Sequence, residues 1–170
     1  MGATFGIHVI LTTFASWVHG DPRGSWINGK LIGPDPFLES AIRARMRHDA
    51  VVLDAVERIV VDVMIGKLVR EKRWRVYAAM IRPTHSHIVF APLRTNIKTV
   101  IAALKYRSAC DVLKVRRNRH IPCGRSVWGG GRFPVFMFDT AHRANGIEYV
   151  RDHNRRVGLP ADPFDWIDPI

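Results

Sequence analysis

The sequence predicts a single α+β domain over residues 1–170, with an antiparallel sheet that carries its helices on one face. Short runs rich in β-branched and aromatic residues alternate with longer segments whose apolar residues recur at helical spacing. Two strand-like runs follow one another directly across Pro83, which indicates an antiparallel hairpin. A length of 170 residues suits one domain, and a hydrophobic content of 47% provides a core.

The first half of the chain is expected to hold one strand and two helices. FGIHVILTTF, Phe5–Phe14, has the composition of a strand. Ser16–Pro36 is rich in Gly and Pro and is expected to be a long loop. Helices are expected at Phe37–His48 and at Leu53–Lys72, and the second has apolar residues at helical spacing, namely Val56, Ile59, Val60 and Val63.

The second half is expected to hold three strands and two helices. The expected strands are Trp74–Ile81, His85–Ala91 and Phe133–Phe138, and the expected helices are Asn96–Lys114 and a last one capped by Asp139 or Thr140 that reaches Arg156. The segment between Lys114 and Gly131 is basic, then Gly-rich, and is expected to be a loop. The resulting order is the split βαβ, or ferredoxin-like, pattern.

The charge balance indicates a polyanionic partner. Twenty-six Lys and Arg against 15 Asp and Glu give a net charge of +11, and nucleic acid is the commonest partner of so basic a domain. The two cysteines, Cys110 and Cys123, lack zinc-site spacing and are expected to be free thiols in a reducing cytosol. Without a membrane-length apolar run or signal-peptide features, the protein is expected to be cytoplasmic, associated with the nucleoid and independent of membranes.

His85-Ser86-His87 is the first candidate for chemistry. Alternate residues of a strand share a face, so both imidazoles project the same way while Ser86 projects the other way. Two parallel imidazoles suit a divalent metal. The alternative is a pair of unrelated histidines on an exposed strand, which spacing alone does not exclude.

Tyr149 and His153 are the second candidate. They lie four residues apart on the last expected helix, and therefore one turn apart on one face. The apolar side of that helix runs through Ala144, Ile147 and Val150, away from this pair. The pair is either an ordinary surface Tyr and His, or a nucleophile with a metal ligand one turn later. In the second case, a phenol and a histidine-bound Lewis acid together supply the parts for cutting a phosphodiester through a covalent phosphotyrosine.

These motifs resemble those of the REP-associated tyrosine transposases and related single-tyrosine HUH transposases of insertion sequences. In AAMIRPTHSHIVF, Pro83, Thr84, His85 and His87 match the family's strand, while Ser86 replaces its usual apolar middle residue. Residues 127–138 and 147–160, VWGGGRFPVFMF and IEYVRDHNRRVGLP, are similar to its Trp-Gly loop, short strand and tyrosine helix, and so is the segment 12–25. Tyr149 falls at the catalytic tyrosine. His153 and Asn154 replace the family's usual Asn-Pro.

The resemblance implies the HUH endonuclease fold and an enzyme that cleaves and rejoins single-stranded DNA, recognised through a hairpin. It implies Tyr149 as the nucleophile, Mg²⁺ or Mn²⁺ as cofactor, and His85, His87 and His153 as ligands. Three imidazoles would favour Mn²⁺ over Mg²⁺. The chain is expected to act as a monomer, or as a homodimer with the tyrosine helix supplied by the partner.

The basic segment from Lys98 to Arg132 is expected to contact the DNA. Its cations suit phosphate contacts, and Trp128 suits either base stacking or a buried role as loop anchor. The candidates are Lys105, Arg107, Lys114, Arg116, Arg117, Arg119, Arg125, Arg132 and Trp128.

Two other functions fit the same residues. A domesticated hairpin-binding protein would bind DNA without cleaving it, which the altered Ser86 and the missing Asn-Pro favour. A metal-dependent RNA or nucleotide phosphoesterase would turn over substrate without a covalent adduct.

Overall fold

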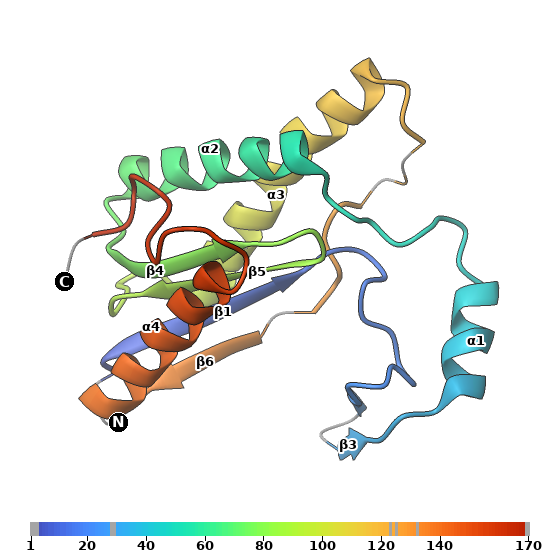
Figure 1. The fold of residues 1–170 in the computed structure, drawn as a ribbon, viewed down its shortest axis with the longest axis horizontal. Helices are drawn as coiled ribbons and strands as arrows, with labels where there is room; N and C mark the ends of the chain where they lie inside the picture. Colours follow the sequence, from blue (N-terminus) through green and yellow to red (C-terminus); the bar gives the residue numbers. More distant parts are fainter. Residues whose placement is uncertain (1–3, 28–29, 123, 125, 132, 169–170) are drawn as a thin grey trace.

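The computed structural model describes residues 4–27, 30–122, 124, 126–131 and 133–168. It contains a four-stranded sheet, a small two-stranded hairpin and four helices (Figure 1). The strands are β1 Gly6–Thr12, β2 Ser25–Ile27, β3 Lys30–Ile32, β4 Val76–Ile81, β5 His85–Phe90 and β6 Phe133–Met137. The helices are α1 Pro36–Ala44, α2 Ala55–Lys72, α3 Ile97–Asn118 and α4 Thr140–Arg155.

The main sheet is antiparallel, with the strand order β4-β5-β1-β6. β1 lies in the interior of the sheet and pairs with β5 so that Ile10 is opposite His87 and Thr12 is opposite His85. The hairpin expected across Pro83 is the β4-β5 pair. The predicted α+β, ferredoxin-like class is therefore confirmed.

Helices cover both faces of this sheet, which differs from the expected single face. α2 and α3 pack on one face over a core that includes Val61, Leu104 and Phe90. α4 lies on the other face, where Ile147 and Val150 join a second apolar cluster on β4, β5 and β6 (Figure 1). The physical reason is that β4 and β5 are buried along almost their whole length, so both of their faces need an apolar cover.

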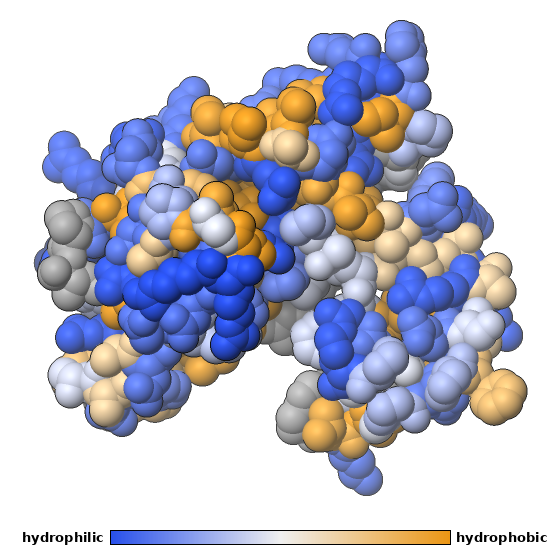
Figure 2. All heavy atoms as spheres, in the orientation of Figure 1, coloured by the Kyte–Doolittle hydropathy of each residue, from blue (hydrophilic) through white to orange (hydrophobic). Residues whose placement is uncertain are grey.

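The buried face of α2 is not the one that the most visible apolar spacing suggests. Val56, Ile59 and Val63 are exposed, and Val61, Ile65, Leu68 and Val69 face the core instead. Figure 2 shows the resulting hydrophobic surface over α2. α2 begins after Asp54, whose carboxylate accepts a hydrogen bond from the Glu57 amide in a capping box.

Two loops contain more regular structure than expected. The β2-β3 hairpin lies within the Gly- and Pro-rich stretch 16–36. α3 continues to Asn118, four residues past Lys114, so the dense basic run forms its last turn rather than a loop. Within the described part of the chain, no helix combines the length and apolarity needed to cross a bilayer.

Candidate active site

β5 carries the two predicted imidazoles on one face of the sheet. The rings of His85 and His87 lie 5.2 Å apart, measured between centroids. Ser86, Ile88 and Phe90 are fully buried, and Ile88 and Phe90 belong to the core on the α2-α3 side. The alternation inferred from the sequence therefore places His85 and His87 on the face that α4 covers.

α4 brings the predicted phenol to these imidazoles within one chain. The Tyr149 ring lies 5.6 Å from the His87 ring and 4.5 Å from the His153 ring. The His153 ring is stacked parallel to the His87 ring at 6.1 Å, with an interplanar angle of 12°. Tyr149 is 49% exposed, so the cluster is open to solvent at this side chain. The four predicted side chains form one cluster.

The orientation of α4 follows from apolar burial and from one amide. Ile147 and Val150 are buried against the sheet, which turns Tyr149 and His153 toward the histidine strand. One turn later, Asn154 is 1% exposed, and its side-chain amide donates to the Ala79 carbonyl of β4 at 2.9 Å and to the Ala161 carbonyl at 2.9 Å. These contacts hold the C-terminal end of α4 against the sheet.

His8 of β1 belongs to the same cluster, and the sequence did not identify it. Its Nε2 lies 2.7 Å from His87 Nδ1 in a buried hydrogen bond, and its ring lies 6.2 Å from Tyr149. The alternation of β1 places His8 on the same face as Ile10, which is the residue opposite His87. The sequence alone does not predict that His8 lies beside His87, because this depends on the register between β1 and β5.

Burial keeps the imidazoles of the cluster neutral. It lowers the pKa of His87 to about 3, with repulsion from His8, His85 and His153 adding to the effect. Burial, together with His142, lowers the pKa of His8 to about 4. The pKa values of His85 and His153 are also lowered, mainly by burial. Neutral rings keep the lone pairs that a metal ion requires.

Because of these pKa values, the metal-free protein will lose stability as the pH falls from about 6.5 toward about 4. Above pH 6.5 the imidazoles are neutral in both the folded and the unfolded chain, so they do not make the free energy of unfolding depend on pH. Below 6.5 the unfolded chain takes up protons that buried His8 and His87 do not, which favours unfolding by up to about 1.4 kcal/mol per pH unit for each ring. Urea denaturation at pH 7.5, 6 and 5 measures this slope, and equal stabilities at pH 7.5 and 5 would contradict it.

The donor set fits an open metal site rather than a closed one. His85 and His87 provide two neutral imidazoles, a ligand type that first-row divalent ions accept. Among the described residues, no group of three or more His, Cys, Asp or Glu side chains is arranged to hold an ion. His153, which the resemblance implies as a third ligand, stacks on His87 instead of converging with His85 and His87 on one point. Water and substrate oxygens would have to complete the coordination of an ion held here.

Arginines near the cluster add positive charge that the sequence did not single out. Arg82, which follows β4, and Arg156, which follows α4, both contribute to lowering the pKa of His153. Arg82 and Arg23 act on His85 in the same way. A phosphodiester approaching Tyr149 would meet these cations.

The predicted DNA-contacting cations lie mainly on α3, on the opposite side of the sheet from this cluster. Arg107 and Arg117 are exposed. Lys114 and Arg119 are also exposed, but they pair with Asp111 at 2.8 Å and with Asp54 at 2.6 Å. Lys105 is half-buried and donates to the Gly129 carbonyl at 2.7 Å and to the Gly131 carbonyl, which holds the Gly-rich loop. Arg125 and Arg132 lie outside the described residues.

Two of the predicted DNA contacts need correction. Arg116 is 7% exposed and forms a bidentate ion pair with buried Glu57, at 2.7 and 2.9 Å. It therefore stabilises the α2-α3 interface and is not positioned to bind a phosphate. Trp128 is 4% exposed, and its indole N–H donates to Ser108 Oγ at 2.9 Å, so it anchors the loop and offers no face to a base. A charged and an aromatic side chain in a basic segment are typical DNA contacts. Their structural roles depend on tertiary packing, which the sequence pattern does not reveal.

Arg116→Met will therefore lower the free energy of unfolding by about 3–5 kcal/mol, because it leaves the Glu57 carboxylate buried without its cation. Exposed Arg117→Met is the matched control and should change stability by less than about 0.5 kcal/mol. Adding Glu57→Leu to Arg116→Met should restore much of the loss. Urea denaturation measures all three, and wild-type stability of Arg116→Met would contradict the structural role.

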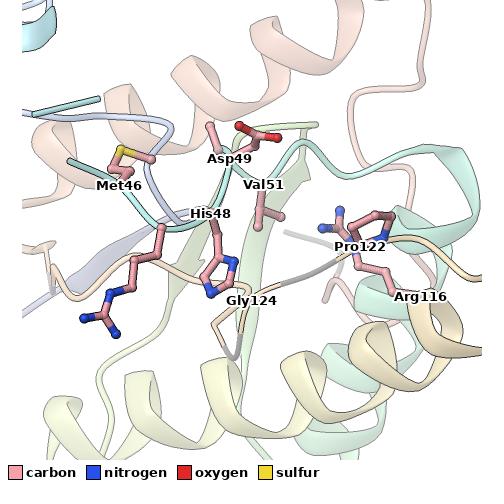
Figure 3. A pocket seen from close by; sticks show the side chains of 9 residues that line it. Met46, His48, Asp49, Val51, Arg116, Pro122 and Gly124 are labelled. Atoms are coloured by element: carbon pink, nitrogen blue, oxygen red, sulfur yellow. The ribbon is translucent and has the colours of Figure 1, made fainter. Parts of the chain in front are cut away.

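A pocket of about 300 Å³ lies apart from the histidine cluster, between the 46–51 segment, α3 and the loop after it (Figure 3). Its lining includes His48, Asp49 and Arg116, and none of the residues of the cluster. This pocket therefore does not coincide with the candidate active site, where Tyr149 is exposed.

Comparison with known proteins gives the fold. No protein-family model and no curated protein matches the sequence. Among solved structures, a REP-associated tyrosine transposase bound to a REP hairpin aligns over 93% of this chain and 72% of its own, with 10% identity and a TM-score of 0.54. This chain shares its fold with that transposase. A putative transposase from Deinococcus radiodurans aligns over 89% of this chain and 92% of its own, with 15% identity and a TM-score of 0.50.

Proposed function

We propose that this protein is a metal-dependent endonuclease and strand transferase that acts on single-stranded DNA through a covalent phosphotyrosine. The observation that carries the proposal is the position of Tyr149, whose ring lies 5.6 Å from His87 and 4.5 Å from His153 on an accessible face. The shared fold with a tyrosine transposase and the net charge of +11 support the same conclusion.

The proposed reaction makes one bond and breaks another. The Tyr149 oxygen attacks the scissile phosphorus and gives up its phenolic proton, and the bond from phosphorus to the 3′ oxygen breaks. The downstream strand stays on Tyr149 through its 5′ phosphate, and the upstream strand leaves as a 3′ hydroxyl after taking up a proton. Attack by a 3′ hydroxyl on the phosphotyrosine reverses these bonds and rejoins DNA.

Each residue of the cluster has a proposed part in this reaction. His85 and His87 would hold a divalent ion, Mn²⁺ or Mg²⁺, which when bound would polarise the phosphate as a Lewis acid. His153 lies against the Tyr149 ring, and we propose that it takes up the phenolic proton. Arg82 and Arg156 would attract the phosphate backbone to this face.

The proposed substrate is a single strand that carries a hairpin. The solved transposase with the same fold is bound to a REP hairpin. For this chain we propose the same class of ligand. Exposed Arg107 and Arg117 of α3 lie across the sheet from Tyr149, so we propose that they contact hairpin phosphates away from the scissile bond.

The test is a denaturing gel of purified protein with a pool of single-stranded oligonucleotides that carry a hairpin and randomised flanks. With Mn²⁺, label at the 3′ end should migrate with the protein, and label at the 5′ end should appear in a shorter free strand. With EDTA neither product should form. Salt-sensitive hairpin binding with no adduct would favour a non-cleaving binding protein, and turnover without an adduct would favour a phosphoesterase.

A further inference from the structure

His8 is a buried polar side chain that has no role in the reaction proposed above. It lies on β1, between β5 and β6, and is 8% exposed. Its side chain bonds directly to a residue of the candidate active site, with Nε2 of His8 and Nδ1 of His87 separated by 2.7 Å. A buried imidazole with so short a bond to a candidate metal ligand constrains that ligand.

Both candidate ligands have the same ring nitrogen engaged. Nδ1 of His85 lies 3.1 Å from the Thr84 hydroxyl, and Nδ1 of His87 is bound by His8. Nε2 of each ring makes no hydrogen bond to any residue within the described part of the chain. Neighbouring groups therefore hold both rings through Nδ1 and leave Nε2 of each for a ligand.

The direction of the His8–His87 bond decides whether His87 can bind a metal ion. A neutral imidazole carries one proton, so a ring that donates through Nδ1 has its lone pair on Nε2. If His87 donates to His8, Nε2 of His87 is available. If His8 donates instead, the His87 proton sits on Nε2 and blocks coordination there.

We propose that His8 is a positioning residue that accepts the Nδ1 proton of His87 and so presents His87 Nε2 to a divalent metal. The inference rests on the proposed function, because it takes His85 and His87 as the ligand pair. His8 itself touches neither the ion nor the substrate in this proposal. We assign the corresponding role for His85 to the Thr84 hydroxyl, which would accept the Nδ1 proton of that ring.

The backbone makes His8 suited to this part. β1 is hydrogen-bonded on both sides, with His8 opposite Val89 of β5 and Val135 of β6, so its position is fixed by two ladders. The ring lies 4.9 Å from the His87 ring at an angle of 42°. A rigid interior strand that holds one ring against another fixes the orientation of a ligand before the ion arrives.

The first test measures Mn²⁺ binding by titration calorimetry. His8→Leu removes the acceptor and should weaken Mn²⁺ binding by about 10- to 100-fold, the usual loss when a ligand's hydrogen-bond partner is removed. His8→Gln offers an amide oxygen in a similar place and should bind Mn²⁺ within a few-fold of wild type. His19→Gln, which changes an exposed histidine, is the matched control and should bind as wild type.

Three further measurements separate positioning from mere folding. Circular dichroism should show folded His8→Gln and His8→Leu, and hairpin binding without metal should be unchanged in both. Tyr149→Phe should bind Mn²⁺ as wild type while forming no adduct. Folded His8→Leu that binds Mn²⁺ as tightly as wild type would overturn the inference and leave the proposed function standing. Wild-type protein that binds no Mn²⁺ would overturn both.

A spectroscopic test uses the wild-type protein and does not depend on the folding of a variant. Long-range ¹H–¹⁵N spectra of the histidine rings report which nitrogen carries the proton. With Zn²⁺ as a diamagnetic probe, His87 should carry its proton on Nδ1 and have Nε2 shifted by the ion. A His87 proton on Nε2, or coordination through Nδ1, would overturn the inference.

Discussion

Tyr149→Phe will abolish the covalent protein–DNA adduct and leave hairpin binding intact. The change removes one oxygen, and without it no phosphotyrosine can form. We expect cleavage to fall by more than about 10⁴-fold, the scale of loss when an enzyme's nucleophile is removed. Because Tyr149 is 49% exposed, the free energy of unfolding should change by less than about 0.5 kcal/mol.

The measurement is a denaturing gel with 3′-labelled hairpin DNA and Mn²⁺, together with a filter-binding titration of the same DNA. Tyr106→Phe is the matched control, because Tyr106 is 71% exposed on α3, away from the histidine face. It should form the adduct as wild type does. An adduct that persists in Tyr149→Phe, or that disappears in Tyr106→Phe, would place the nucleophile elsewhere.

His85→Ala will reduce Mn²⁺-dependent cleavage by at least about 100-fold, because it removes one of two proposed imidazole ligands and the Lewis acid with it. His85 is only half-buried, so its removal leaves a smaller defect than that of His87, which is 6% exposed. The residual rate of His85→Ala should require more Mn²⁺ than wild type does. His87→Ala should show the same catalytic loss, with a cost in stability in addition.

The measurement is the initial rate of adduct formation over a series of Mn²⁺ concentrations, with thermal unfolding to verify that each variant is folded. Exposed His19→Ala serves as the control and should match wild type in both. If folded His85→Ala and His87→Ala both cleave at the wild-type rate, the two histidines do not hold a catalytic ion.

Local periodicity was sufficient for much of the candidate site. His85 and His87 share a face because strand residues alternate, and Tyr149 and His153 share a face because a helix turns every 3.6 residues. The β4-β5 hairpin and most helix positions followed from turn residues and apolar patterns for the same reason. These features depend on residues close together in the chain.

Residues whose use depends on distant partners could not be assigned in this way. Arg116 resembled a phosphate contact until Glu57, 59 residues away, was found to neutralise it in the core. Val56, Ile59 and Val63 resembled a core stripe, yet α3 and the sheet contact another side of α2. His8 resembled an ordinary strand residue, although it is 79 residues from the His87 ring that it binds.

By itself, the sequence determined which residue types share a face and the four side chains that make up the predicted cluster. Only the tertiary structure decided that α4 covers the face of the sheet opposite α2 and α3, and that Tyr149 meets His87 within one chain. The physical reason is that periodicity sets the direction of a side chain relative to its own element. The partner across the sheet is set by strand register and by the burial of apolar area over the whole chain.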